Sequence, residues 1–195
     1  MIKLGITGGI GCGKSYVAHL LQERGIPVYD TDREAKRLMV SHPVIRRKLT
    51  ELLGEAVYEG DVLNKPLLAG YLFACKDNAE RVNSVVHPCV YDDFLRWTKM
   101  HECSGKETVA MESAILFESG FDRAVDRVLM VYAPMELRVR RAMERDHASE
   151  EQVRLRMAAQ ADDEEKISRS DYVVMNDGIS SLDIQLDRIL QALKE

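Results

Sequence analysis

Residues 8–15 read Gly8-Gly9-Ile10-Gly11-Cys12-Gly13-Lys14-Ser15. This stretch fills every fixed position of the pattern G-x-x-x-x-G-K-[ST], in which glycines let successive backbone N–H groups point at an anion. In such a loop the lysine reaches the β- and γ-phosphates of a nucleotide, and the next hydroxyl holds Mg²⁺. The sequence therefore predicts a catalytic role for Lys14, a metal ligand in Ser15, and a nucleotide phosphate site formed by Gly9, Ile10, Gly11, Cys12, Gly13, Lys14, Ser15 and Tyr16.

The residues on either side of this loop support the prediction. Residues 2–7 read as a short buried strand, and residues 15–24 carry helical spacing through Val17, Leu20 and Leu21. A strand, a glycine loop and a helix N-terminus together make an anion site, because the helix dipole adds to the free N–H groups. The alternative is a glycine-rich turn followed by Lys-Ser by chance, which a chain of this length contains with a frequency of order 1%.

Composition narrows the classes of protein that fit the chain. Its 195 residues suit one domain with modest insertions, and a net charge of −5 argues against a general nucleic-acid binder. No apolar run reaches the length of a membrane span, and we expect no signal peptide because the first residues lead directly into the loop. The four cysteines form no C-x-x-C pair, which is typical of free thiols in a reducing compartment. We expect a cytoplasmic monomer with neither nucleic-acid nor membrane partners.

Predicted strands alternate with predicted helices along the chain. The strands cover residues 2–7, 26–29, 107–112, 128–132 and 171–175. This alternation predicts an α/β fold in three layers, with a five-stranded parallel sheet covered by helices on both faces. Residues 33–103 show helical spacing and no convincing strand, and within them Pro88 is expected to kink or interrupt the helix predicted over residues 78–100.

Acidic residues follow two of the predicted strands. Asp32 comes after the second strand, where it is either the base that accepts a proton from a substrate hydroxyl or, like Asp30, only a helix N-cap. Glu112 ends the third strand, as does the acid that helps to hold the water shell of Mg²⁺ in phosphate-loop enzymes. Glu118 is a second candidate for that role, although a solvated charge is the stronger interpretation of it.

Four arginines lie close together after the fourth strand, at Arg138, Arg140, Arg141 and Arg145. They are either a solvated helix face or part of a lid that supplies guanidinium groups to the transferring phosphoryl group. Further on, Asn176-Asp177-Gly178 is a strong turn signal, and Ser180 or Ser181 is expected to cap the last helix.

Taken together, these motifs resemble the dephospho-CoA kinase family. The resemblance rests on residues 6–15, Asp30-Thr31-Asp32, His87-Pro88, residues 115–118, Arg141-x-x-x-Arg145-Asp146, Gln160, residues 170–174 and Asn176-Asp177-Gly178. It covers essentially the whole chain and implies ATP-dependent phosphorylation of the ribose 3′-hydroxyl of dephospho-CoA. It also implies a phosphate-loop kinase fold over residues 1–195, with a helical acceptor-binding insertion at 33–105 and a lid at 138–168.

The resemblance assigns roles to particular residues. It implies that Asp32 faces the acceptor hydroxyl as the catalytic acid–base group, that Arg141 is catalytic, and that Arg145 approaches the ATP phosphates. Asn176 is expected near the adenine of ATP, and His87 in the acceptor site without a proton-transfer role. The chain departs from the common pattern at Cys12, Tyr16, Ala114 and Lys65. Cys12 is either redox-sensitive or, more simply, a small side chain that fits the loop.

Two other functions are compatible with a phosphate loop. Another small-molecule or nucleoside monophosphate kinase carries the same phosphate loop, but the full set of motifs speaks against it. A GTP-binding switch usually carries N-K-x-D for guanine, and here Asn64-Lys65-Pro66-Leu67 lacks the aspartate.

Overall fold

The computed structural model describes residues 1–160 and 162–194. The chain divides into two compact units, one formed by Met1–Asp30 with Thr98–Glu195 and the other by Thr31–Trp97. We call them the phosphate-loop unit and the helical unit.

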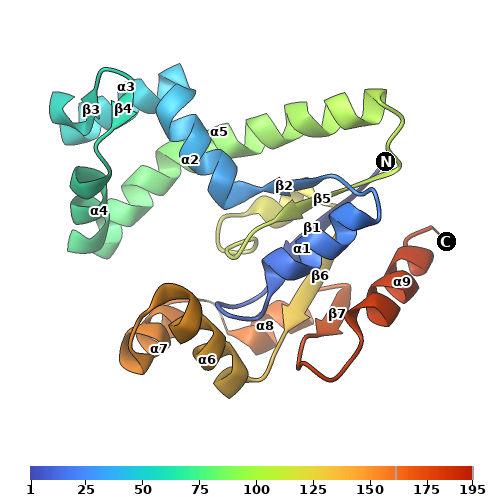
Figure 1. Cartoon of the computed structure of the whole chain (residues 1–195). Helices are drawn as coiled ribbons and strands as arrows, with labels where there is room; N and C mark the ends of the chain where they lie inside the picture. Colours follow the sequence, from blue (N-terminus) through green and yellow to red (C-terminus); the bar gives the residue numbers. More distant parts are fainter. Residues whose placement is uncertain (161, 195) are drawn as a thin grey trace. The chain divides into compact units, whose positions relative to one another are not determined.

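A parallel sheet forms the centre of the phosphate-loop unit (Figure 1). Its strands are β1 (Ile2–Thr7), β2 (Val28–Asp30), β5 (Thr108–Glu112), β6 (Arg127–Tyr132) and β7 (Tyr172–Met175), in the order β2-β5-β1-β6-β7. Every neighbouring pair is parallel, so the predicted five-stranded parallel sheet is confirmed. Since parallel strands end at the same edge, the ends of β1, β2 and β5 lie together: Ile6 and Asp30 are both in register with Glu112.

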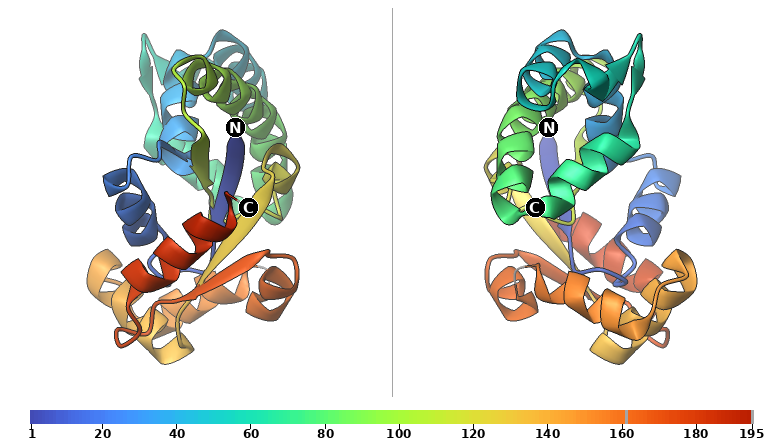
Figure 2. Two further views of the ribbon diagram at one scale, coloured as in Figure 1. Left: turned by 90° about the vertical axis from the view of Figure 1, so that its right-hand side faces the viewer. Right: turned by 90° about the vertical axis from the view of Figure 1, so that its left-hand side faces the viewer.

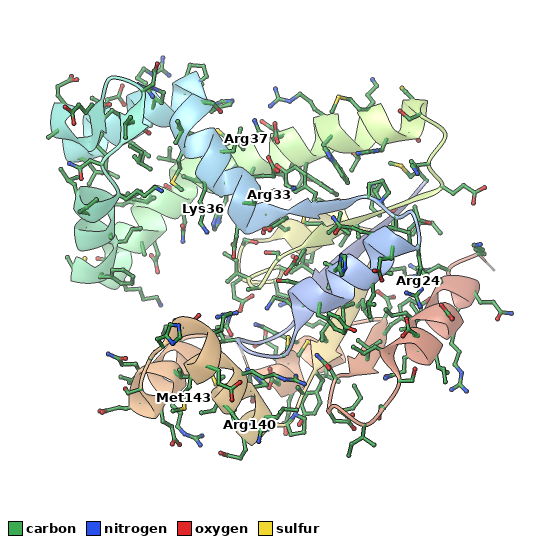
Figure 3. The ribbon with its side chains drawn as sticks, in the orientation of Figure 1. Arg24, Arg33, Lys36, Arg37, Arg140 and Met143 are labelled. Carbon is green, nitrogen blue, oxygen red and sulfur yellow. The ribbon has the colours of Figure 1, made fainter. Side chains whose placement is uncertain are left out.

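Helices cover both faces of this sheet. On one face, α1 (Lys14–Glu23) and α9 (Leu182–Ala192) bury leucines and valines against Leu4, Ile6 and Leu129. Arg24 extends from the end of α1 toward α9, where it pairs with Asp183 at 2.7 Å and Asp187 at 3.0 Å (Figure 3). The short helix α8 (Asp163–Ser168) lies on the opposite side of the sheet from α1 (Figure 2). The single-turn η2 (Phe121–Ala124) leads from β5 to β6.

Two helices follow β6 before the chain returns to the sheet. They are α6 (Met135–Asp146) and α7 (Glu150–Ala158), and they share a small core of Val139, Ala142, Val153 and Met157. Ser149 begins α7 with a capping box, in which its hydroxyl accepts from the Gln152 N–H and the Gln152 side chain accepts from the Ser149 N–H. The apolar face of α6 therefore serves this small core, and its arginines occupy the remaining positions.

The helical unit consists of short helices and one hairpin. Its elements are α2 (Thr31–Ser41), α3 (Pro43–Leu53), η1 (Glu55–Val57), β3 (Tyr58–Glu59), β4 (Val62–Leu63), α4 (Lys65–Ala74) and the first part of α5 (Lys76–Cys103). The expectation that this region holds no strand is wrong, because β3 and β4 pair as an antiparallel hairpin. Each strand has only two residues, which is too short to show the alternation by which a strand is recognised.

The helix α5 runs through Pro88 as a single element. A proline inside a helix removes one N–H donor and leaves the carbonyl four residues earlier, here that of Ser84, without its usual partner. Both Ser84 and Pro88 are exposed, so water reaches that carbonyl and the helix continues. Among the described residues, no helix combines the length and the apolar character that crossing a membrane requires.

Candidate functional site

The loop between β1 and α1 presents an anion site. Gly13 precedes α1 with a left-handed φ of 92°, and a Cβ at this position would overlap the Asn176 amide, so both the backbone and the packing require glycine. Within residues 1–160 and 162–194, the N–H groups of Gly11, Gly13, Lys14 and Ser15 have no acceptor. These donors lie at the start of a helix, where the dipole also favours negative charge. The local geometry is therefore that of a phosphate cradle.

Lys14 adds a positive charge to this cradle. Its Nζ donates to the Gly8 carbonyl at 2.9 Å and lies 3.5 Å from the Gly9 carbonyl. The ammonium group thus lies over residues 8–11, which we call the first limb of the loop, and residues 12–13 form the other limb. Lys14 itself belongs to the first turn of α1. A single side chain therefore places positive charge beside the N–H groups of the loop.

Ser15 and Glu112 come together from α1 and β5. The Ser15 hydroxyl donates to Glu112 Oε1 at 2.7 Å across 97 residues of chain. The structure therefore joins the two side chains that were predicted to serve a metal ion. No three His, Cys, Asp or Glu side chains in the described part of the chain form a cluster of their own. Such an arrangement suits Mg²⁺, which is usually bound by one or two protein oxygens together with substrate phosphates and water.

Asn176 and Arg141 border the other limb of the loop. The Asn176 side-chain amide donates to the Cys12 carbonyl at 2.8 Å, and Arg141 donates to the Asn176 carbonyl at 3.0 Å. Asp177 closes the predicted turn by accepting from the N–H groups of Ser180 and Ile179, and these bonds lower the pKa of its carboxyl group. Cys12 itself is buried, so its small side chain fits within the packed loop.

Arg145 pairs with its neighbour in the chain. Its Nε donates to Asp146 Oδ1 at 2.7 Å, and Arg156 from α7 contacts the same carboxylate at 2.9 Å. The Arg145 bond, with a smaller contribution from Arg156, lowers the pKa of Asp146 to about 2. A phosphate group that binds Arg145 must therefore compete with an ionised carboxylate.

Tyr16 is exposed on α1 beside the loop.

Glu118 contacts a lysine that is fully buried in α8. Lys166 Nζ lies 3.1 Å from Glu118 Oε1 and donates to the Ala114 carbonyl at 3.3 Å. The interpretation of Glu118 as a solvated charge is therefore wrong, because its carboxylate supplies the counter-charge of a buried ammonium group. The pair joins the segment after β5 to α8.

Asp32 and His87 belong to the helical unit. Helix α2 begins at Thr31, so Asp32 lies in its first turn rather than at its N-cap, and its side chain is exposed. Its carboxylate makes no hydrogen bond or ion pair with the other described residues. His87 lies half-buried on α5, and this burial lowers the pKa of its imidazole. His87 is therefore neutral at pH 7.

Comparison with known proteins identifies the family. The sequence pattern of dephospho-CoA kinase matches residues 2–181 of this chain. The chain belongs to the dephospho-CoA kinase family. A dephospho-CoA kinase of Bacteroides fragilis is 50% identical over 192 residues, which cover 98% of this chain and 93% of the relative. A dephospho-CoA kinase of Porphyromonas gingivalis is 43% identical over 196 residues, covering 100% of this chain and 95% of the relative.

Solved structures show the same fold. A Thermus thermophilus protein superposes with a TM-score of 0.77 at 38% identity, over 98% of this chain and 95% of that one. The dephospho-CoA kinase of Campylobacter jejuni superposes with a TM-score of 0.69 at 22% identity, over 99% and 96% of the two chains. A shikimate kinase of Acinetobacter baumannii shares the fold, with a TM-score of 0.55 at 16% identity over 100% and 94%. The predicted phosphate-loop kinase fold is confirmed, and membership of a kinase family decides against a GTP-binding switch.

Three residues of this dephospho-CoA kinase family member have structural roles that sequence reasoning missed. Arg138 and Gln160 contact the loop at Ile10, and Lys166 is the buried partner of Glu118. In the sequence, Arg138 is one of four clustered arginines, Gln160 is one of the motif residues of the resemblance, and Lys166 lies in a highly charged stretch. Charged residues on helices usually face solvent, so the burial of Arg138 and Lys166 has no local sequence signal.

Proposed function

We propose that this chain transfers the γ-phosphoryl group of ATP to the ribose 3′-hydroxyl of dephospho-CoA, giving coenzyme A and ADP in the last step of coenzyme A synthesis. The observation that carries the proposal is the 50% identity to a dephospho-CoA kinase over 98% of the chain. The phosphate loop and its unpaired N–H groups support it, because phosphoryl transfer depends mainly on positioning and charge stabilisation. We assign the reaction to the cytoplasm, which the four free thiols support.

The direct test is transfer of labelled phosphate from ATP to an acceptor. Dephospho-CoA, AMP, shikimate and gluconate are offered side by side at equal concentration. We expect label in the 3′-phosphate of coenzyme A and only background label in the other three. Preferential labelling of AMP, shikimate or gluconate would establish a different small-molecule kinase.

Within this function, the nucleotide is held by residues of the phosphate-loop unit. The N–H groups of the loop and the Lys14 ammonium stabilise charge on the β- and γ-phosphoryl oxygens. Arg141 lies beside the loop through its bond to Asn176, which supports a position near the nucleotide. Arg145 is the more mobile contributor in this proposal, since it exchanges Asp146 for phosphate when nucleotide binds.

We assign a Mg²⁺ ion to Ser15 and Glu112, whose side-chain oxygens are 2.7 Å apart. Ser15 would hold the ion directly, and Glu112 would orient the Ser15 hydroxyl and accept hydrogen bonds from bound water. The ion would supply positive charge that neutralises the phosphate oxygens. Both positions are fixed by regular structure, because Ser15 is in α1 and Glu112 ends β5.

Replacement of Glu112 tests the metal assignment. We expect Glu112→Gln to raise the Mg²⁺ concentration at half-maximal activity by about 10-fold or more, because partners of metal ligands typically contribute 10–100-fold to affinity. The matched control is Glu118→Gln, which changes the other acid after β5 and is expected to leave the Mg²⁺ dependence unchanged. Equal Mg²⁺ dependence in the two variants would remove Glu112 from the metal site.

We further propose Asp32 as the group that orients and deprotonates the acceptor hydroxyl. Its carboxylate is exposed and unpaired within residues 1–160 and 162–194, and it follows the last residue of β2 by two positions. A base must be free to accept a proton, and a carboxylate committed to an ion pair is not. Ligands of open α/β sheets bind beyond the carboxyl ends of the strands, which supports a role for the residues that follow β2.

The Asp32→Asn variant separates this role from nucleotide binding. We expect kcat to fall by about 10²–10⁴-fold, the usual contribution of a positioned acid–base group. ATP affinity, measured by calorimetry, is expected to stay near the native value. Lys14→Ala is the comparison variant, because it should weaken both ATP binding and turnover. Native turnover in Asp32→Asn would exclude the base assignment.

A further inference from the structure

Both backbone polar groups of Ile10 are held by side chains that come from more than 120 positions further along the chain. The Ile10 carbonyl accepts from Arg138 Nε at 2.9 Å, and the Ile10 N–H donates to Gln160 Oε1 at 2.9 Å. Arg138 lies on α6, and Gln160 follows α7. The middle of the phosphate loop is therefore held from outside the phosphate-loop motif.

The Arg138 guanidinium group is buried and is held by two partners. The Arg138 side chain is 4% exposed, and its Nη1 donates to the carboxylate of Asp163, at the start of α8. A buried cation needs both a counter-charge and acceptors for its N–H groups, and Asp163 and Ile10 supply them. The planar fork of arginine serves two partners at once in a fixed geometry, which the single ammonium group of lysine does not reproduce.

Two loop glycines fit against this arginine. A Cβ on Gly9 would overlap the Arg138 guanidinium group, and a Cβ on Gly11 would overlap the Arg138 carbonyl. The φ of Gly9 lies outside the left-handed region, so Gly9 is required by the close approach of Arg138 and not by backbone conformation. Arg138 and the first limb of the loop are thus packed as one piece.

This limb is the one that meets the transferred group. Lys14 Nζ lies against the carbonyls of Gly8 and Gly9, and a phosphate-loop lysine reaches the β- and γ-phosphates. The opposite limb leads into α1 and is held by Asn176 instead. The contacts of Arg138 and Gln160 therefore fall at the γ-phosphate end of the loop.

We propose that Arg138, held by Asp163 and assisted by Gln160, is a positioning residue for the γ-phosphoryl group of the donor. It fixes the Ile10 carbonyl and so sets the direction of the neighbouring loop N–H groups. Two of its N–H groups, on Nε and Nη1, serve Ile10 and Asp163, and in this proposal it acts on the phosphate through the loop. The inference rests on the proposed function in one respect, namely that the loop binds a nucleoside triphosphate.

The test compares two nucleotides that differ by the γ-phosphate. Binding of ADP and of a non-hydrolysable ATP analogue, both with Mg²⁺, is measured by calorimetry on the native chain and on Arg138→Lys, which keeps a cation beside Asp163. We expect affinity for the analogue to fall about 10-fold or more and affinity for ADP to change by about twofold or less, because a hydrogen bond to a charged group has a strong effect on affinity. The kcat for phosphoryl transfer is expected to fall with the analogue affinity.

Arg140→Met is the matched control. Arg140 is labelled on the same helix in Figure 3, it is exposed, and it has no partner among the described residues. We expect native affinities for both nucleotides in this variant. Equal losses of ADP and analogue affinity in Arg138→Lys, or a loss of thermal stability alone, would make Arg138 purely structural and overturn the proposal.

A second variant covers the case in which Arg138→Lys does not fold. Gln160→Ala removes the acceptor of the Ile10 N–H at a partly exposed site, and it is expected to lower analogue affinity about threefold with native ADP affinity. An unchanged ratio of the two affinities would again overturn the proposal. Failure of the native chain to phosphorylate dephospho-CoA would overturn the proposed function and leave this nucleotide comparison intact.

Discussion

Polar contacts inside the phosphate-loop unit join residues that lie further apart in the chain than those joined by polar contacts inside the helical unit. The Ile10 N–H donates to Gln160 across 150 residues, Asn176 donates to the Cys12 carbonyl across 164, and Ser15 donates to Glu112 across 97. In the helical unit, Arg37 donates to Asp93 across 56 residues, Tyr58 to the Met39 carbonyl across 19 and Arg46 to the Gly60 carbonyl across 14. The first unit builds a site by bringing distant segments to one short motif, whereas the contacts of the second unit span shorter stretches of chain.

The candidate residues of the two units also differ in whether they have partners. In the phosphate-loop unit, the candidate residues Lys14, Ser15 and Asn176 all have defined partners. In the helical unit, the Asp32 carboxylate has no such partner among residues 1–160 and 162–194. A phosphate site must be rigid to present several N–H groups at once, while a base must keep its lone pairs free for the acceptor.

The largest effect on this comparison is expected from Lys166→Met. Lys166 is fully buried, and loss of its ammonium group removes the cation that pairs with Glu118 and the donor to the Ala114 carbonyl. Removing one member of a buried pair costs about 3 kcal/mol or more, and we expect about 2–3 kcal/mol here because Glu118 is partly exposed. Hydrogen exchange measured by mass spectrometry should show faster exchange in β6 and α8.

Lys36→Met is the control for this substitution. Lys36 is exposed on α2 and has no partner among the described residues, so the change should stay within about 0.5 kcal/mol. If Lys166→Met accelerated exchange in both units to the same extent, the two units would unfold as one. The two units would then differ in the range of their contacts and not in their stability.

Much of this architecture could be predicted from the sequence. The five strands of the parallel sheet were predicted because each is a short, mainly apolar run that is followed by glycine, proline, asparagine or acidic residues. Ser15 and Glu112 were each predicted to serve Mg²⁺ from the pattern of phosphate-loop enzymes, and the structure brings them together. Both inferences depend on local patterns with well-understood geometry.

The remaining features could not be predicted because they depend on tertiary packing. The hairpin of β3 and β4 has two residues in each strand and shows no alternation. Arg138 and Lys166 are buried charges, yet each lies on a helix, where charged side chains usually face solvent. Only the partners Asp163 and Glu118 reveal their burial, and those partners lie 25 and 48 residues away in the chain.

A smaller effect, confined to the helical unit, is expected from Asn64→Ala. The Asn64 side chain accepts from the Leu67 N–H at 3.1 Å as the N-cap of α4, and it donates to the Ala56 carbonyl at 3.2 Å. Loss of such a cap costs about 1 kcal/mol. The single tryptophan, Trp97, belongs to the helical unit, so its fluorescence in a urea titration reports this unit.

Ser181→Ala provides the matched change in the phosphate-loop unit. Ser181 caps α9 by accepting from the Ile184 N–H at 3.4 Å. We expect the midpoint of the Trp97 transition to fall in Asn64→Ala and to stay near the native value in Ser181→Ala. Equal shifts in the two variants would show that Trp97 reports a single cooperative transition of the whole chain.

The smallest effect is a pH dependence that comes from His87. Burial lowers the pKa of this imidazole below the unfolded value of about 6.5, so the unfolded state binds more protons in the range between the two values. The unfolding free energy of the helical unit should therefore be highest above pH 6.5 and decrease as the pH falls through 6.5 toward the lowered pKa. Urea midpoints of Trp97 fluorescence between pH 5 and 8 measure this slope.

His87→Gln should remove that slope, whereas His19→Gln, which changes an exposed histidine on α1, should retain it.

The result also bears on the acceptor site. A neutral imidazole at pH 7 offers hydrogen bonds without a charge, so in the proposed acceptor site His87 would act by hydrogen bonding and not by pairing with a phosphate. A slope that persists in His87→Gln would show that other groups cause it and that the folded and unfolded states protonate His87 alike.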